Sequence, residues 1–127
     1  MLTWPRRARL ILYRDADGRV PFLDWLESLD SSTRAKCRVR LRRLAELGHQ
    51  LRRPEADYVE NGIHELRAKH ARINHRMLYF FHGREIVLTH GFTKQQARVP
   101  RREIELALSR KRSFEVDPGT HAHVEDA

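Results

Sequence analysis

Basic residues and histidines gather in one stretch whose two ends have the composition of core β-strands. The stretch is GIHELRAKHARINHRMLYFF, residues 62–81. Its polar centre contains Arg67, Lys69, His70, Arg72, His75 and Arg76. A second basic group, which follows the last strand-like run, contains Lys94, Arg98, Arg101 and Arg102. Arginine offers a planar fork of donors and lysine a compact charge, so the two groups would suit a phosphate-rich ligand if they converged on one concave face of a small sheet.

These residue types can cleave RNA without a metal ion. The reaction needs a base for the 2′-hydroxyl, an acid for the departing 5′-oxygen and cations for the charge of the transition state. His75 and His90 are candidates for the acid and the base, because imidazole titrates near neutral pH. Arg67 and Lys94 are candidates for stabilising the charge on the phosphate. These four residues form the predicted catalytic set, and the products would be a 2′,3′-cyclic phosphate and a 5′-hydroxyl.

Other residues near this set are predicted to contact the RNA. They are Lys69, Arg72, Arg76, Arg98, Arg101 and Tyr79, the last of which could orient a base or transfer a proton. Structural alternatives stand beside these roles. Arg67 could pair with Glu65 or with an acidic partner. His90 lies in an apolar run, where a buried and hydrogen-bonded histidine is the commoner finding, and Tyr79 lies in a run whose alternate residues face the core.

The charge of the chain narrows the choice of partner. The net charge is +8, with an isoelectric point near 10.5. Residues 113–127 hold four acidic residues and no lysine or arginine, so the net charge of residues 1–112 is +12. A domain this basic predicts a polyanionic partner, either nucleic acid or an acidic protein. The alternative is a soluble basic protein with no such partner.

Composition also bears on cofactors and compartment. The eight histidines are scattered and there is no Cys-x-x-Cys pair or His-Glu-x-x-His motif, so we expect no metal site and no cofactor. No apolar run approaches the length of about 18 residues that spans a membrane, and no signal peptide is recognised. The single cysteine, Cys37, fits a reducing compartment. The expected location is the cytoplasm.

Hydrophobic periodicity predicts one α+β domain over residues 1–114, followed by a polar, disordered tail over 115–127. Asp30 or Ser31 is the expected N-terminal cap of the longest helix, and Gly48 its C-terminal glycine. The predicted architecture is an N-terminal strand and a helical hairpin packed on a mostly antiparallel four-stranded sheet, with a C-terminal helix. The predicted elements are a strand near 8–14, helices within 20–30 and 30–51, a polar connector at 52–62, strands near 63–68, 75–82 and 86–92, and a helix from Pro100.

The order of these motifs resembles that of a known family. The phage-derived, HigB-like branch of the RelE/ParE toxin superfamily has an L-x-E-L-R strand, a basic loop and an R-x-x-Y-F strand. It continues with I-x-L-L-H-G-F-x-K-K and a T-P-x-x-E-I-x-x-A helix. The corresponding segments here read IHELR, RMLYFF, IVLTHGFTKQ and RVPRREIELA, and FLDWLESLDSSTRAKCRVRLRRLAELG resembles the family's helical hairpin. The resemblance covers about residues 8–114.

The resemblance implies a toxin of a type II toxin–antitoxin module. Such toxins typically cleave messenger RNA on the ribosome without a metal ion, and a cognate antitoxin, usually with a helix-turn-helix, neutralises them in a hetero-oligomeric complex. By position, Arg67 matches the family's phosphate-binding candidate and Arg76 an arginine that is often structural. One departure is that Lys94 precedes Gln95 and Gln96, where the family often has a lysine pair. Relatives in the ParE branch inhibit DNA gyrase instead, and a nucleic-acid-binding module without toxicity is a third hypothesis.

Overall fold

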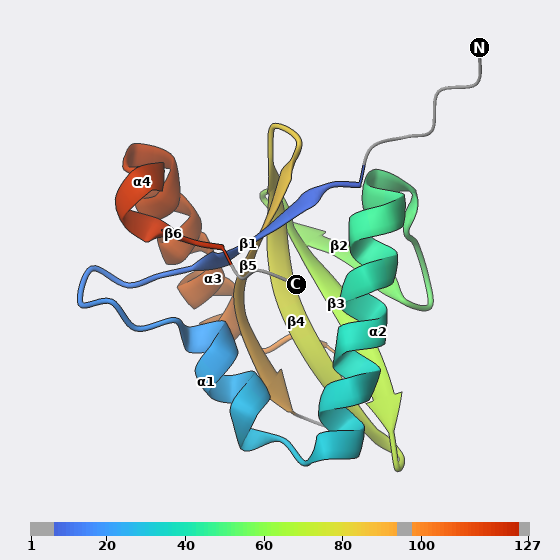
Figure 1. The fold of residues 1–127 in the computed structure, drawn as a ribbon. Helices are drawn as coiled ribbons and strands as arrows, with labels where there is room; N and C mark the ends of the chain where they lie inside the picture. The colour runs from blue at the N-terminus through green and yellow to red at the C-terminus, as the bar shows by residue number, and fades with distance from the viewer. Residues whose placement is uncertain (1–6, 94–97, 125–127) are drawn as a thin grey trace.

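A computed structural model describes residues 7–93 and 98–124 of the chain and shows an α+β fold built on one mixed sheet (Figure 1). The sheet has six strands in the order β2-β3-β4-β5-β1-β6. The strands are β1 (Arg9–Tyr13), β2 (Ala56–Glu60), β3 (Ile63–His70), β4 (Ile73–His82), β5 (Glu85–Thr93) and β6 (Ala122–His123). The helices are α1 (Pro21–Ser28), α2 (Ser31–Leu47), α3 (Arg101–Val116) and α4 (Pro118–His121), with a 3-10 turn at Gly48–Gln50.

The sheet is larger than the four-stranded one expected from the sequence. β2 to β5 form an antiparallel series, whereas β1 pairs in parallel with β5. β1 therefore lies inside the sheet, because β6 pairs with its other edge. The expectation of four strands is wrong because two short strands, β2 and β6, lie in segments that were read as a connector and a tail.

The first missed strand, β2, belongs to the segment read as a polar connector. It is joined to β3 by Asn61 and Gly62, which both have positive φ angles, 48° and 85°. An Asn-Gly pair between two strand-like runs is the usual signal for a two-residue hairpin turn. This signal was present in the sequence, where Tyr58 and Val59 precede the pair.

The second missed strand follows the C-terminal helix. α3 continues to Val116, and Asp117 then caps α4 by accepting from the N–H of Thr120. β6 follows and pairs with Leu12 and Tyr13 of β1. In place of the loose tail expected from residue 115, the described part of this segment is packed on the sheet edge.

The helices cover both faces of the sheet and create two apolar layers. α1 and α2 lie on one face, where Phe22, Leu26, Cys37 and Leu44 are buried against it. α3 lies on the other face, where Ala107 and Phe114 pack on residues such as Phe80. Side chains of a strand alternate between the two faces. Neighbouring residues of β3 and β4 therefore belong to different surroundings.

Local contacts fix the helical hairpin that was predicted from the sequence. The Asp30 carboxylate accepts from the Thr33 N–H at 2.8 Å, which confirms Asp30 as the N-terminal cap of α2. Gly48 ends the helix with φ 53°. The Arg34 side chain donates to the carbonyls of Leu26 and Leu29, at 3.3 and 2.9 Å, and thereby ties α2 back to the end of α1. These contacts fix how α2 leaves the end of α1.

Candidate functional site

A cleft lined by cations lies where β3 and β4 extend beyond the end of β2. Strand pairing places Arg67 opposite Arg76 and Lys69 opposite Asn74, with all four side chains on the α3 side of the sheet. The cleft has a volume of about 510 Å³, and its walls are formed by Arg40, Pro54, Arg67, Lys69, Asn74 and Arg76. Like charges placed directly opposite each other in a sheet repel, so an anion in the cleft would relieve this repulsion.

Helix α2 contributes the fourth cation of the cleft across the edge of the sheet. Arg40 Nε donates to the Arg67 carbonyl at 3.1 Å. The Arg67 N–H in turn donates to the Glu55 carbonyl at 2.8 Å. These bonds satisfy backbone groups of β3 just past its pairing with β2, and they bring the Arg40 guanidinium to the rim.

Acidic residues hold the cleft arginines in place. Glu65 is 3% exposed, and its carboxylate accepts from Arg67 Nε and lies 4.0 Å from an Arg76 NH group. Asp57 of β2 lies 3.5 Å from another Arg67 nitrogen. The structural alternative for Arg67, pairing with Glu65, is therefore seen. This pairing leaves the Arg67 side chain 32% exposed, and a guanidinium has five N–H donors, so contact with an anion remains compatible with it.

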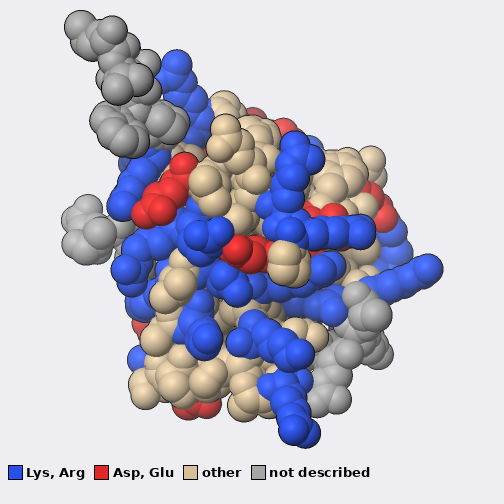
Figure 2. Space-filling model, turned by 90° about the vertical axis from the view of Figure 1, so that its right-hand side faces the viewer, with Lys and Arg blue, Asp and Glu red and all other residues tan. Residues whose placement is uncertain are grey.

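The cleft belongs to a broadly basic side of the molecule. Figure 2 shows a band of Lys and Arg side chains across this side, with only scattered Asp and Glu between them. Helix α2 also carries exposed arginines, among them Arg38, Arg42 and Arg43. Arg43 is partly neutralised by Glu55, which accepts from it at 2.5 and 3.0 Å. A long polyanion could therefore contact more of this side than the cleft alone.

His75 does not share the cleft with Arg67. Alternation along β4 turns it to the α1 face, where it is 6% exposed and its ring centroid lies 6.4 Å from that of Trp25. His75 Nδ1 lies 2.9 Å from the Thr93 hydroxyl. Burial lowers the pKa of this histidine below its usual value. The two residues predicted to act together are thus separated by the thickness of the sheet.

His90 faces the α3 side but is buried beside that helix. It is 5% exposed, with Nδ1 3.1 Å from the Thr89 hydroxyl and Nε2 3.7 Å from Glu103. Burial, with a smaller effect of Arg110, lowers the pKa of His90 to about 3. The expectation that this histidine titrates near neutral pH is therefore wrong, and the alternative of a buried, hydrogen-bonded histidine describes it better.

The remaining predicted residues are dispersed. Tyr79 is 1% exposed on the α2 face, and burial raises the pKa of its hydroxyl. Arg101 forms a bidentate ion pair with Glu60, with N–O distances of 2.6 and 2.7 Å. Arg72 is exposed in the β3–β4 turn, and Arg98 is exposed before α3. Lys94 lies outside the described residues.

Sequence reasoning therefore found three of the cleft residues and missed three. Arg67, Lys69 and Arg76 follow from alternation along two paired strands. Asn74 shares the same alternation with Arg76 and could have been included. Arg40 and Pro54 could not be placed, because their positions depend on how α2 and the following loop pack against the strand edge. Across residues 7–93 and 98–124, no group of three or more His, Cys, Asp or Glu residues could hold a metal ion.

Fold and cleft together define a small basic α+β domain with a cleft lined by cations. A comparison with protein families matches residues 24–112 to the family described as Phage derived protein Gp49-like (DUF891). This match spans more than half of the chain, so the chain belongs to that family, a RelE/ParE-like toxin family of toxin–antitoxin modules. Membership implies an antitoxin partner. No curated protein matches the chain. Within the described part, no helix is both long enough and apolar enough to cross a membrane.

Proposed function

We propose that this chain is a HigB-like toxin that cleaves messenger RNA on the ribosome, in the cytoplasm, by metal-independent attack of a 2′-hydroxyl. The observation that carries the proposal is the cleft, in which Arg40, Arg67, Lys69 and Arg76 converge in a chain of a toxin family. A dianionic transition state at phosphorus is stabilised by preorganised cations, which is a large contribution to catalysis in such sites. Guanidinium groups also match the paired oxygens of a phosphate.

Within the cleft, the chemistry of the side chains suggests a division of roles. Arg67 is held from behind by Glu65 and has a side chain that is 32% exposed, so it can donate to the scissile phosphate, whereas the buried Arg76 adds positive charge beneath it. Lys69 is the lining residue best suited to move a proton, because guanidinium groups keep theirs at all accessible pH values. Its ammonium group would protonate the departing 5′-oxygen, while the proton of the attacking 2′-hydroxyl would pass to water. His75 and His90, which face other surroundings, would then act through the fold and not on the substrate.

The same cleft suggests how an antitoxin neutralises the chain. An acidic segment of the antitoxin would occupy the cleft and compete with RNA, because both offer oxygen anions to the same guanidinium groups. We propose a hetero-oligomeric toxin–antitoxin complex in which the antitoxin also carries a helix-turn-helix. Free toxin would bind RNA with a strong dependence on salt, since each phosphate contact releases counterions.

Primer extension on translated messages after induced expression tests the proposal. The wild-type chain should produce discrete breaks within codons, and Arg67→Ala should remove them while the protein remains folded by circular dichroism. The matched control is Arg112→Ala, which removes an exposed arginine of α3 away from the cleft. Full cleavage by a folded Arg67→Ala protein would exclude the cleft as the site.

The same expression experiment, combined with a gyrase assay, distinguishes the ParE-like alternative from the nuclease. A gyrase inhibitor would leave messages intact and would instead block supercoiling by purified gyrase. Unbroken messages together with inhibited supercoiling would overturn the nuclease proposal and favour that alternative. Unbroken messages without inhibition of gyrase would favour a nucleic-acid-binding module without toxicity.

A further inference from the structure

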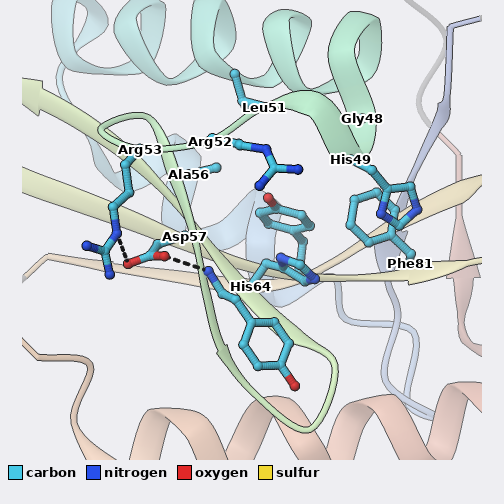
Figure 3. A pocket seen from close by; sticks show the side chains of 11 residues that line it. Gly48, His49, Leu51, Arg52, Arg53, Ala56, Asp57, His64 and Phe81 are labelled. Carbon is cyan, nitrogen blue, oxygen red and sulfur yellow. Dashed lines mark hydrogen bonds and ion pairs between the residues drawn. The ribbon is translucent and has the colours of Figure 1, made fainter.

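A second hollow lies on the face of the sheet opposite the cleft. Its volume is about 450 Å³. Figure 3 shows Arg53 and Asp57 on one side of it and His49 and Phe81 on the other, with Arg52 and His64 between them. The hollow exists because α2 ends at Leu47 and the chain then loops away from the sheet before β2 begins. The remaining lining residues are Gly48, Leu51, Ala56, Tyr58 and Tyr79.

The floor of this pocket is a row of aromatic rings on three adjacent strands. Strand pairing places Tyr58 opposite His64 and His64 opposite Tyr79. The rings of His64 and Tyr79 are stacked, with centroids 5.2 Å apart and planes 19° apart. Tyr58 and Phe81 each present an edge to His64, at 5.1 Å. Tyr79 is buried behind the others, whereas Tyr58 is 57% exposed and its ring is accessible to a ligand.

The walls of the pocket add one more ring and a cation. His49 stacks on Phe81 with ring centroids 3.6 Å apart, so the 3-10 turn contributes a ring from the side opposite β2. Arg52 is exposed, and its guanidinium points toward the centre of the hollow (Figure 3). Burial and the neighbouring His49 lower the pKa of His64. The lowered pKa favours the uncharged form of the ring, which offers a π surface for stacking.

A single carboxylate connects the pocket to the cleft. Asp57 accepts from Arg53 of the pocket wall at 2.9 Å, and it lies 3.5 Å from Arg67 of the cleft. The next residue after Arg53, Pro54, lines the cleft. The two hollows therefore flank the same short segment at the start of β2. A strand of nucleic acid that follows the basic side of the molecule could reach both.

We infer that this pocket binds a nucleobase of the RNA strand whose backbone lies on the cleft. Stacked rings beside a guanidinium suit a planar aromatic group attached to an anionic backbone, and aromatic side chains on a sheet surface are a common platform for unpaired bases. The volume lies within the range of about 300–1,000 Å³ that is typical of small-molecule sites. The identity of the strand rests on the proposed function, but recognition of a base does not.

Binding of RNA that lacks a base tests the pocket directly. The probe is a short fluorescein-labelled 2′-O-methyl oligouridylate, which cannot be cleaved by 2′-hydroxyl attack, and its partner is the same oligomer with abasic residues. Because stacking of one base typically strengthens binding by about tenfold, the full-length chain should bind the base-bearing oligomer about tenfold more tightly. Equal affinities for the two oligomers would overturn the inference.

Two variants test whether this preference for base-bearing over abasic RNA arises in the pocket. Arg52→Ala changes an exposed side chain, and His64→Leu replaces one ring of the row with an apolar group of similar size. Both should reduce the tenfold discrimination to about twofold or less, whereas Arg112→Ala should retain it. If His64→Leu fails to fold, Arg52→Ala still decides the outcome. A folded Arg52→Ala protein with wild-type discrimination would exclude a base beside that guanidinium.

A spectroscopic measurement distinguishes a base in RNA from a free nucleotide. In NMR spectra of the chain labelled with ¹³C-histidine, we follow the ring signals of His64 and His49 while uridine monophosphate or the oligomer is added. Shifts with uridine monophosphate would mean that a single nucleotide is enough to occupy the pocket. Shifts with the oligomer alone would assign the pocket to a base held within a strand. Shifts of neither ring with either ligand would contradict the inference.

The outcomes also separate this inference from the proposed function. If Arg52→Ala loses base discrimination and the wild-type chain does not cut messages, the pocket is supported and the nuclease is rejected. Codon-internal breaks by a wild-type chain that treats base-bearing and abasic oligomers alike would support the nuclease and reject the pocket.

Discussion

The cleft and the pocket are neighbours on β3, yet they differ in almost every physical property. The cleft uses Arg67 and Lys69 on the α3 side, and the pocket uses His64 on the α2 side. The cleft is held by a buried carboxylate and the pocket by contacts between rings. One strand can support both because its side chains alternate between two faces. The charged surface and the aromatic surface are therefore separated by one residue of strand register, and a shift of a single residue would exchange them.

The largest effect should come from removing the carboxylate behind the cleft. Glu65→Ala leaves the Arg76 side chain, which is 4% exposed, without this neighbouring anion. Loss of one partner from a buried charge pair typically costs about 3–5 kcal/mol, so the free energy of unfolding should fall by about 3 kcal/mol. At the same time the cleft gains positive charge, so the folded fraction should bind RNA more tightly. Urea unfolding and RNA titration measure the two effects.

The control for this change keeps the shape of the side chain. Glu65→Gln retains an acceptor for Arg67 but loses the charge, so its unfolding free energy should lie between those of the wild type and Glu65→Ala. The matched change on the other face is His64→Leu, which should affect base discrimination without raising the affinity for abasic RNA. A Glu65→Ala protein as stable as the wild type would show that the arginines do not depend on this carboxylate.

These contrasts also show which features were accessible from the sequence. Alternation and turn signals located β3 to β5, and alternation along the paired strands accounts for Arg67 and Arg76 on one face. The same rule separates His75 from Arg67, because the two residues occupy positions of opposite parity across the paired strands. The predicted catalytic set joined residues by their chemistry without applying this rule to each of them.

Other features depend on packing that no local pattern specifies. Gly91 has an ordinary sequence context, but a Cβ there would lie 2.2 Å from the Trp25 ring, so α1 can approach β5 only over a glycine. The low pKa of His90 arises because α3 covers it. Arg40 reaches the cleft because the α2 axis passes over the edge of β3. Each result requires the relative placement of elements distant in sequence.

The next prediction compares the two faces of the sheet by the pH dependence of stability that each buried histidine, His90 or His75, contributes. For His90 the folded pKa is about 3, whereas an unperturbed histidine has a pKa near 6.5. Below about pH 6.5 the unfolded chain therefore binds a proton that the folded chain does not. His90 thus makes the free energy of unfolding fall with decreasing pH, by at most about 1.4 kcal/mol per pH unit down to pH 3. His90→Leu should reduce this slope.

Chemical unfolding at several values between pH 7 and pH 5 measures the slope. His75→Leu should change it less, because His75 carries a smaller shift in the same direction on the α1 face. Equal pH dependence of the wild type and His90→Leu would mean that His90 takes up a proton in the folded protein. It could then serve in proton transfer, as the sequence suggested.

The last and smallest effect concerns the salt dependence of RNA binding. It contrasts a cation that is already paired with a carboxylate and a cation that is exposed to solvent. Arg101 is bound by Glu60, whereas the exposed Lys69 lines the cleft. Neutralising one phosphate contact with single-stranded nucleic acid reduces the slope of log affinity against log salt by about 0.7. Lys69→Ala should show this reduction, and Arg101→Ala should leave the slope unchanged because its charge is compensated in the free protein. RNA titrations from low to moderate salt measure both. A reduced slope in Arg101→Ala alone would move the RNA path from the cleft toward the start of α3, and would restore the role that the sequence gave to Arg101.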